Sequence, residues 1–567
     1  MLPTFNLSGG KTMSFISVFD VLGPNMIGPS SSHTAGAAAI ALLARKMFHY
    51  ELKTVRFTLY GSFAQTYKGH GTDRALLGGI MGFSTDDRRI PDSFTIASQA
   101  GISYSFSTNL TDTEVHPNTV DILMSDDKGH TLLVRGESTG GGKVRITRIN
   151  QVKVDFTGEY STLIIIQQDK PGVIAHITRC LSEKNVNIAY MKLYREEKGS
   201  TAYSIVESDG VLPAEAADQI RTNSYVQDVM LIQPHEKNEP DLLQKGAASP
   251  SQQGTNESVS SGTESDLSAL EAPYRNKRRF RSGIELLSQC ENSGCLISDI
   301  MLQSESRETL RPEKELLDQM RHTWKIMKAS AFDPVKSPKQ SIGGLIGGEA
   351  QLLSRHHADG KNICGNTLSR AITYAMAVLE NSASMGLIVA APTAGSSGIV
   401  PGVMLALQEA YSLSDTQIIR ALFNAGAIGY LAMRNATVAG AVGGCQAEVG
   451  VAASMAASAA VELMGGAPKQ CLYAASTVLM NMLGLVCDPV GGLVECPCQG
   501  RNAAGAANAL TAAELALSGI QQPIPFDEML DAMYTVGKRL PSEYRETAKG
   551  GCAATPTGCS LCSLNVE

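Results

Sequence analysis

A polar, low-complexity stretch divides the chain and sets the main limit on its fold. Residues 237 to about 273, KNEPDLLQKGAASPSQQGTNESVSSGTESDLSALEAP, are rich in Ser, Gly, Gln, Pro and Glu and have no repeated apolar period. Such a composition cannot bury enough apolar surface to offset the entropy of ordering the chain. We therefore expect a disordered linker over residues 237–275, with separately folded parts on either side. The basic run Lys277-Arg278-Arg279 is expected to be the solvated entrance to the second part.

The part after the linker is expected to be helical. From Phe280 the sequence is rich in Ala, Gly and Met, and ETLRPEKELLDQMRHTWKIMKAS and TLSRAITYAMAVLENSA have helical periodicity. Almost nothing there alternates with the period of two that is typical of strands. Residues 276–567 are thus predicted to form one large all-α domain whose helices are separated by Gly-rich loops.

The part before the linker mixes helix and strand signals. SSSHTAGAAAIALLARKMF pairs a Ser/Thr cluster with apolar residues at helical spacing, which predicts a helix capped by Ser32 or Thr34. KTVRFTLYGSF alternates and is β-branched, as strands are. Residues 14–152 are predicted to be an α/β (α+β) domain. Residues 1–13 are predicted to be an extension, because MSFISVFDVLG from Met13 reads like a second natural start.

Residues 153–236 follow the order strand, helix, strand, strand, helix, strand. YSTLIIIQQ, NIAYMKLYRE, STAYSIVES and VQDVMLIQP are the expected strands, and KPGVIAHITRCLSEKNV and PAEAADQIRTN the expected helices. This order predicts a ferredoxin-like fold, so the whole chain is multidomain. With the turn Asp169-Lys170-Pro171-Gly172 after its first strand, the segment resembles an ACT domain, a regulatory module that binds amino acids. Another ferredoxin-like domain is the alternative.

Composition and charge argue against several classes of partner. The formal net charge of −7 disfavours nucleic acid or an anionic membrane as the main partner. GLIVAAPTAGSSGIVPGVMLAL and ALFNAGAIGYLAMRNATVAGAVGG are interrupted by polar residues, Pro or Gly and do not read as membrane spans. The start of the chain lacks a signal-peptide pattern. We expect a cytoplasmic protein, whose twelve cysteines are free thiols, catalytic groups or metal ligands rather than disulfides.

Three cysteines lie in segments broken by Gly and Pro. Glycines flank Cys445 in GGCQAEVG, Asp-Pro follows Cys487, and Pro497 precedes Cys498. Small neighbours let the backbone approach a bulky centre, and three thiolates can bind zinc or an iron–sulfur cluster with one metal position left open. The alternative is that these are ordinary buried cysteines. Spacing does not decide between the two, and Cys496 competes with Cys498 as a candidate.

Other segments gather hydroxyl, amide and imidazole groups. IGPSSSHTAG lies at a predicted helix N-terminus, which suits a carboxylate, and GSFAQTYKGHGTDRA places a histidine between glycines. VHPNTVD, CGNTLSRAITYA and APTAGSSGIVPG add further polar groups. Each is weak alone, because a Ser/Thr-Gly turn is usually a cap. The candidate residues are Ser30, Ser31, Ser32, His33, Thr34, His70, His116, Asn118, Thr119, Asn366, Ser369, Arg370, Ser396 and Ser397.

Taken together and in order, these segments resemble the iron–sulfur-dependent L-serine dehydratases (L-serine ammonia-lyases). GPSSSHT, YKGHGTD, HPNT, GNTLSRAITYAMAV, APTAGSSGIVPG, GGCQAEVG, CDPV and PCQGRNA carry the resemblance, which covers nearly the whole chain. Residues 14–234 resemble the β-chain of the two-subunit form, including its ACT domain, and residues 280–565 resemble its α-chain. The fusion departs from the two-chain pattern and gives both halves in fixed stoichiometry.

The resemblance implies a metal site. Cys445, Cys487 and Cys498 correspond to three ligands of a 4Fe-4S cluster, and Cys496 to none. The fourth iron would have no protein ligand and could coordinate the β-hydroxyl of serine as it leaves.

The resemblance also implies an acid–base site. His70, with His33 as the alternative, is the expected base for the α-proton. The segment Ser30–Thr34 is expected to hold the carboxylate of L-serine, and the remaining polar candidates to contribute to substrate binding. The products would be pyruvate and ammonia.

Alternatives to this function are β-elimination from L-threonine or L-cysteine on the same scaffold, and an amino-acid sensor without catalysis. A pyridoxal-phosphate route is disfavoured, because no Ser-x-Lys-x-Arg-Gly-like stretch is present. The ACT resemblance implies a homodimer and an amino-acid or monovalent-cation effector. Cys552, Cys559 and Cys562 are expected to lie in a poorly ordered tail.

Overall fold

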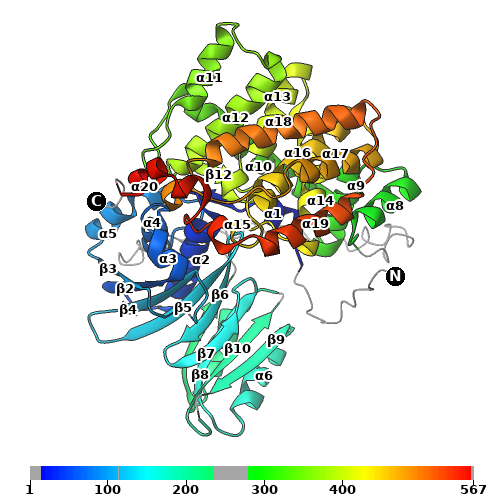
Figure 1. The fold of residues 1–567 in the computed structure, drawn as a ribbon. Coiled ribbons are helices and arrows are strands. Elements are labelled where there is room, and N and C mark those ends of the chain that lie inside the picture. The colour runs from blue at the N-terminus through cyan, green and yellow to red at the C-terminus, as the bar shows by residue number, and fades with distance from the viewer. Residues whose placement is uncertain (1–14, 113, 196, 209, 234–278, 564–567) are drawn as a thin grey trace, which may run out of the picture.

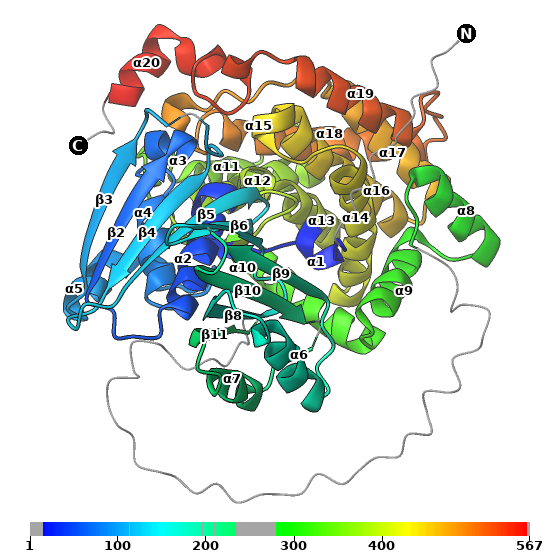
Figure 2. The same cartoon turned by 90° about the horizontal axis from the view of Figure 1, so that it is seen from below.

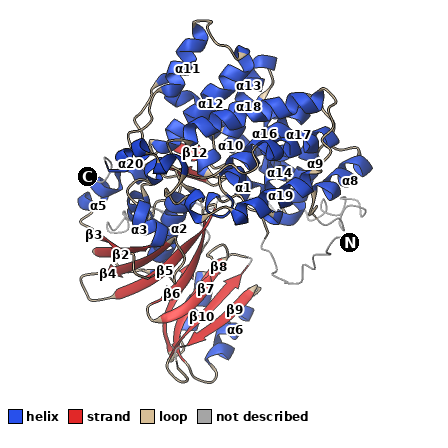
Figure 3. Cartoon of the chain, viewed as in Figure 1, coloured by secondary structure: helices blue, strands red, loops and turns tan. Residues whose placement is uncertain are grey.

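The computed structural model describes residues 15–112, 114–195, 197–208, 210–233 and 279–563. The predicted N-terminal extension and linker lie outside these residues. Figures 1 and 3 show a helical half, drawn uppermost, and a lower half that holds the strands of the two larger sheets. The predicted multidomain class, with α/β, ACT and helical parts, is confirmed.

A six-stranded sheet forms the core of the first part. Its order is β3-β2-β4-β5-β6-β7, with β2 and β3 parallel and the other pairs antiparallel. Helices α2 and α4 pack on each other, and α2 also packs against β5 and β6. The strands are β2 (Thr54–Tyr60), β3 (Ser103–Asn109), β4 (Thr119–Ser125), β5 (Thr131–Gly140), β6 (Lys143–Ile149) and β7 (Val152–Phe156), and the helices are α2 (Gly36–Met47), α3 (Gly61–Thr66), α4 (Thr72–Ile80) and α5 (Ser93–Gln99).

The ACT part has the predicted order of elements. Its antiparallel sheet runs β11-β8-β10-β9, and Figure 2 shows α6 and α7 on one side of it. Leu163, Ile164 and Ile165 of β8 are buried between these helices and the neighbouring first part, and Ile166 is half-buried, which explains the unbroken apolar run of this central strand. The elements are β8 (Ser161–Gln168), α6 (Val173–Glu183), β9 (Tyr190–Arg195), β10 (Thr201–Ser208), α7 (Ala214–Arg221) and β11 (Val226–Ile232).

The second part is a helical bundle around α16 (Val451–Leu463). All residues from Val451 to Val461 are buried, and the alanines of this helix allow α14, α17 and α18 to pack closely around it. The other helices are α8 (Gly283–Ser293), α9 (Ile297–Thr309), α10 (Glu313–Lys336), α11 (Glu349–Ala358), α12 (Gly365–Ala383), α13 (Ile399–Tyr411), α14 (Asp415–Asn435), α15 (Gly440–Gly443), α17 (Pro468–Asn481), α18 (Cys498–Leu517), α19 (Phe526–Arg539) and α20 (Pro556–Ser563).

The two parts are joined by a short sheet and a buried helix. β1 (Asn25–Ile27) from the first part pairs antiparallel with β12 (Leu387–Val389) of the helical part. The preceding helix α1 (Val18–Val21) packs into the helical core against α14. The first part and the helical part therefore share a continuous interface.

The structure differs from three local predictions. Arg279, expected in a solvated entrance to the helical part, is instead buried. The helix after the Ser/Thr cluster is capped by Ser30 rather than Ser32 or Thr34, because it starts with a π-helical turn, Ser31–Ala35, and the Ser30 hydroxyl accepts from the backbone N–H of His33. The predicted poorly ordered tail instead continues to α20, which packs beside the turn Val490–Gly492. Among the described residues, no helix is long and apolar enough to cross a membrane.

Candidate active site

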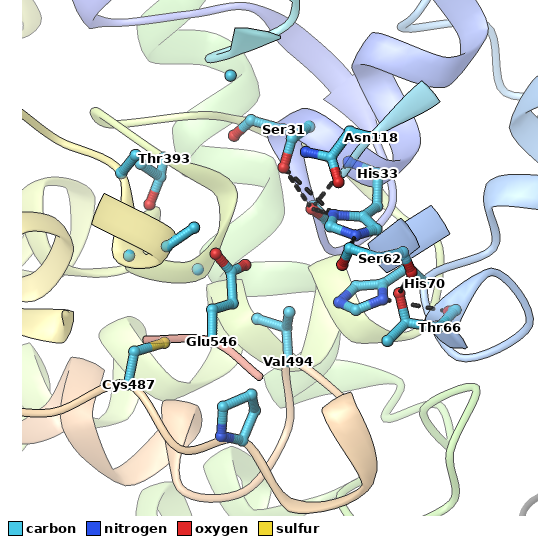
Figure 4. A pocket seen from close by; sticks show the side chains of 18 of the residues that line it. Ser31, His33, Ser62, Thr66, His70, Asn118, Thr393, Cys487, Val494 and Glu546 are labelled. Carbon is cyan, nitrogen blue, oxygen red and sulfur yellow. Dashed lines mark hydrogen bonds between the residues drawn. The ribbon is translucent and has the colours of Figure 1, made fainter. Parts of the chain in front are cut away.

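A cavity of about 560 Å³ lies where the first part meets the helical part. The loop before α2, the α3–α4 region and the turn before β4 line one side. The loop before α13, the segment from Ala439 to Val449 and the C-terminal segment line the other. Figure 4 shows His33 and His70 on one side of this cavity and Cys487 on the other. Segments that the sequence places hundreds of residues apart therefore share one site.

Three of the cysteines line the cavity and are buried. Cys445 precedes a π-helical turn, Cys487 follows α17 and Cys498 begins α18. The sulfurs of Cys445 and Cys487 and a carboxylate oxygen of Glu448 all lie within 4.8 Å of one another. Cys496, in contrast, is exposed and is absent from the cavity wall.

Arg501 stabilises negative charge on the cysteines. Its Nη1 lies 3.5 Å from the sulfur of Cys445 and donates to the carbonyl of Val486 at 2.8 Å, while its Nη2 pairs with Asp488 at 2.7 Å. A hydrogen bond from Cys487 is the main cause that lowers the pKa of Cys445, and Arg501 adds to it, whereas burial opposes it. The same hydrogen bond, followed by burial, raises the pKa of Cys487 well above its ordinary value.

This donor set fits an iron–sulfur cluster. Three buried thiols converge on one wall next to a guanidinium that favours thiolates, which are the ligands such clusters use. Gly440 leaves room beside them, because a Cβ there would lie 3.3 Å from the sulfur of Cys487 and 2.5 Å from Glu448.

The two predicted histidines stack on each other. The ring centroids of His33 and His70 are 4.5 Å apart. The Nε2 of His33 is 2.9 Å from the hydroxyl of Ser62, and its Nδ1 is 3.3 Å from the hydroxyls of Ser30 and Ser32. Burial lowers the pKa of His70 to about 4, and burial together with the charge of His70 lowers that of His33 well below its ordinary value. Both rings are therefore neutral near pH 7.

The tautomer of His70 follows from its partner. Its Nδ1 lies 3.2 Å from the backbone carbonyl of Thr66. Because a carbonyl only accepts, Nδ1 carries the hydrogen and Nε2 carries the lone pair. No hydrogen bond among the described residues engages this Nε2. His70 is thus the imidazole with an available basic nitrogen.

The Ser/Thr cluster contributes to the site in two ways. Ser30, Ser31 and Ser32 line the cavity, and the hydroxyl of Ser31 accepts from the N–H of Ala394 at 2.9 Å across the two parts. Thr34 is not a lining residue and instead donates to the carbonyl of His70 at 2.8 Å. Its role is to position the backbone that carries His70.

The turn before β4 contributes His116 and Asn118 to the cavity. The Oδ1 of Asn118 is buried and has no hydrogen-bond partner among the described residues. Thr119 does not line the cavity; its hydroxyl donates to the carbonyl of His116 at 2.6 Å and so fixes the turn.

Besides Thr34 and Thr119, five further predicted substrate contacts do not reach the cavity wall. Ser396 and Ser397 are buried and bond to neighbouring backbone carbonyls, and so they shape the turn whose residues Thr393–Gly395 do line the cavity. The other three lie near the start of α12, where Asn366 is exposed and Ser369 and Arg370 are half-buried. These are Asn366, which contacts His357; Ser369; and Arg370, which pairs with Glu409.

Several lining residues were missed by sequence reasoning. The clearest examples are the carboxylates of Glu448 and Glu546. Burial raises the pKa of Glu448 well above its ordinary value, and it raises the pKa of Glu546 to about 7. Glu448 could have been noticed, because it lies inside GGCQAEVG. Ser62 and Thr66 could have been noticed too, because they lie inside GSFAQTYKGHGTDRA. No sequence signal pointed to Glu546, Arg545 or Lys549.

The chain is similar to known proteins along most of its length. Residues 17–148 match the family described as serine dehydratase beta chain, residues 161–223 match the ACT domain, and residues 292–553 match the serine dehydratase alpha chain.

Individual relatives give the same picture. A probable L-serine dehydratase alpha chain from Bacillus subtilis is 46% identical over 282 residues, which are 50% of this chain and 94% of the relative. An L-serine dehydratase beta chain from Peptoniphilus asaccharolyticus is 44% identical over 197 residues, 35% of this chain and 89% of the relative. An L-serine dehydratase from Streptomyces coelicolor is 30% identical over 552 residues, 96% of this chain and 100% of the relative.

Proposed function

The chain belongs to the serine dehydratase family, with beta-chain and alpha-chain parts fused in one polypeptide, and we propose from this premise that it converts L-serine to pyruvate and ammonia. The observation that carries the proposal is the shared cavity, in which three buried thiols face two neutral histidines across a space lined by hydroxyl groups. The reaction removes the α-proton and the β-hydroxyl of the substrate.

Cys445, Cys487 and Cys498 would hold a 4Fe-4S cluster. When bound, such a cluster supplies a Lewis acid that eases departure of the β-hydroxyl. The support comes from the burial of the three thiols, the nearby Arg501 and the exposure of Cys496.

His70 would accept the α-proton at its Nε2. The backbone carbonyl of Thr66 keeps the hydrogen on the opposite nitrogen, so the lone pair is available without rearrangement. Burial keeps this ring neutral, which a base requires. Both ring nitrogens of His33 lie within hydrogen-bond distance of serine hydroxyls, so His33 would instead stack on His70 and fix its orientation.

Ser30, Ser31 and Ser32 would hold the substrate carboxylate. Their hydroxyls line the cavity at the start of the helical segment that continues into α2, where backbone N–H groups also favour an anion. Loss of the α-proton and of the β-hydroxide, which together make one water, yields aminoacrylate, which tautomerises to an imine and hydrolyses to pyruvate and ammonia.

The organisation predicted from the sequence completes the proposal. Residues 14–152 would form the beta-type part, 153–236 a regulatory ACT domain that binds an amino acid or a monovalent cation, 237–275 a linker and 276–567 the catalytic part. The enzyme would act in the cytoplasm as a homodimer.

Anaerobic assays test the proposed function. Pyruvate release should be fastest, by kcat/KM, with L-serine rather than L-threonine or L-cysteine, and visible absorbance from the cluster should fade together with activity when air is admitted. Higher kcat/KM on L-cysteine would overturn the choice of substrate. Absence of iron, sulfide and activity after reconstitution would favour the amino-acid sensor.

A further inference from the structure

Glu546 is held in the cavity by an unusual backbone. It lies in the C-terminal segment, whose backbone bridges to Cys487: the N–H of Cys487 donates to the carbonyl of Tyr544 at 2.9 Å, and the N–H of Glu546 donates to the carbonyl of Cys487 at 2.8 Å. The φ of Glu546 is +64°. A left-handed conformation costs a residue with a side chain about 1–2 kcal/mol, and such conformations persist where surrounding structure enforces them, often at functional sites.

Neighbouring contacts fix the same segment. The φ of Ala548 is also positive, at +56°, and the N–H of Cys552 donates to a carboxylate oxygen of Asp488 at 2.6 Å. The segment is therefore tied to both residues of the Cys487-Asp488 pair. These ties direct the side chain of Glu546 into the cavity, between Cys487 and the two histidines (Figure 4).

The carboxylate of Glu546 has no cationic partner among the described residues. Its one hydrogen bond is from the backbone N–H of Ala441. Arg545 and Lys549 also line the cavity, but neither forms an ion pair with it. A carboxylate in such a place is ready to accept a cation from a ligand.

The other carboxylate in the cavity is already engaged. Glu448 accepts a hydrogen bond from the thiol of Cys487 at 3.8 Å. It therefore belongs with the thiols. The neutral histidines and the serine hydroxyls cannot neutralise a positive charge, so among the described lining residues Glu546 is the acceptor best placed for one.

We propose that Glu546 binds the α-ammonium group of the substrate and so selects amino acids over other hydroxy acids. This inference rests on the proposed function, since it concerns the same cavity. The carboxylate would be held by the serine cluster and the ammonium by Glu546, which leaves the α-proton facing the histidine pair. The contact is made by a residue more than five hundred positions from that cluster.

The test uses two ligands that cannot react and differ only in the ammonium group, L-alanine and propionate. Their affinities are measured by anaerobic calorimetry on the cluster-loaded full chain. Wild type should bind L-alanine more tightly than propionate. Glu546→Gln should weaken L-alanine binding by about 10- to 100-fold, the value of a charged hydrogen bond, and should leave propionate binding nearly unchanged.

Controls separate this role from a structural one. Glu543→Gln, an exposed neighbour, should bind both ligands as wild type does, and Glu546→Asp should retain part of the preference for L-alanine. Iron content and thermal unfolding report whether each variant is folded. If Glu546→Gln does not fold, Glu546→Asp decides instead: a reduced preference for L-alanine supports the contact, and an unchanged preference overturns it.

The outcomes distinguish the two proposals. Equal affinity of wild type for both ligands, or equal loss of both in Glu546→Gln, overturns the ammonium contact, even if pyruvate is released from L-serine. The wild-type protein could instead be inactive on L-serine and still prefer L-alanine, with that preference lost in Glu546→Gln. This result overturns the dehydratase function and retains the ammonium contact.

Discussion

At the scale of single residues, exposure separates two cysteines that are close in sequence. Cys498 lies at the first position of α18 with its thiol on the cavity wall, whereas Cys496 precedes it on the exposed side of the turn. Burial of a thiol without a partner costs little, but three buried thiols in the wall of one cavity are expected of a metal site.

Substitutions of the cavity cysteines and of Cys496 should differ in how much iron and sulfide the protein retains. Cys445→Ala, Cys487→Ala and Cys498→Ala should each lose most of the bound iron and sulfide, because each removes one of only three thiolate ligands. Cys496→Ala is the matched control and should retain them. Iron and sulfide analysis of anaerobically purified protein measures the difference, and loss of iron in Cys496→Ala would contradict the assignment.

The histidine pair offers a second residue-scale prediction. His70→Asn should reduce kcat/KM for L-serine by about 10²- to 10⁴-fold, the usual contribution of a general base. His33→Asn should have a smaller effect, because the role proposed for His33 is to orient His70. His49 is exposed, and His49→Asn should match wild type. A larger loss in His33→Asn than in His70→Asn would reverse the two roles.

Burial of His70 should also make the fold sensitive to acid. The pKa of this ring is lowered from 6.5 to about 4. Between these pH values His70 is therefore protonated in the unfolded chain but neutral in the folded one. The free energy of unfolding therefore falls as pH falls from about 6.5 to about 4, by roughly 3 kcal/mol for this residue. Below about pH 4 this contribution changes no further.

Denaturant unfolding at pH 7 and pH 4.5 measures this loss of stability in acid. The loss between these two pH values should be smaller in His70→Asn than in wild type, because the variant lacks the histidine whose protonation is suppressed in the folded state. His49→Asn again serves as the control. Identical losses in wild type and His70→Asn would show that the burial of His70 does not limit acid stability.

At the scale of elements, glycines in α14 allow α1 to enter the helical core. A Cβ at Gly426 would lie 2.3 Å from Cγ2 of Val18, and one at Gly429 would lie 2.3 Å from Cγ1 of Val21. The two helices thus touch through backbone and valine side chains. This contact holds α1 in place. The chain continues from α1 through β1 to the serine cluster, Ser30–Ser32.

Adding a methyl group at this contact should loosen it. Gly426→Ala should lower the free energy of unfolding by about 1–3 kcal/mol, since overpacking a dense core forces neighbours to move. Gly500→Ala in α18 is the contrasting variant, because nothing lies within 4 Å of its added Cβ, and it should be neutral or stabilising. Chemical denaturation compares them, and equal stability of the two variants would contradict the close contact.

At the scale of the whole molecule, the first part and the helical part depend on each other. Besides the β1–β12 pair, buried Arg279 donates to the carbonyl of Ile16 and to Glu305, and Glu305 also bonds to Ser17. Removal of one partner from such a buried ion pair leaves the other charge uncompensated. The cavity has walls from both parts, so neither part alone can form the site.

If the chain is divided at the predicted linker, the two parts should therefore remain associated. Residues 1–236 and 276–567, produced together as two chains, should copurify and release pyruvate from L-serine, whereas either chain alone should be inactive. Arg279→Met in the second chain should weaken copurification. Failure of the two intact chains to associate, measured by size-exclusion chromatography, would mean that the interface needs the covalent connection.

Sequence patterns predicted most of the elements because those signals are local. Alternation identified strand β2 of the first part, and apolar spacing identified the helices of the ACT part and of the bundle. Local signals were less reliable for single polar residues. The hydroxyls of Ser396 and Ser397 shape a turn and Arg370 forms a surface ion pair, although each lies in a motif as polar as the one around His33.

The sequence by itself determined the family, the order of the folded parts and the cysteines and histidines that the site would need, since these depend on residue type and order. Only the tertiary structure decided which of those residues share a cavity. Ser31 and Ala394 touch although 363 positions separate them, and Glu546 reaches the site through a backbone bridge to Cys487. Contacts of this kind depend on how helices and sheets pack, and packing is a property of the whole chain rather than of any local pattern.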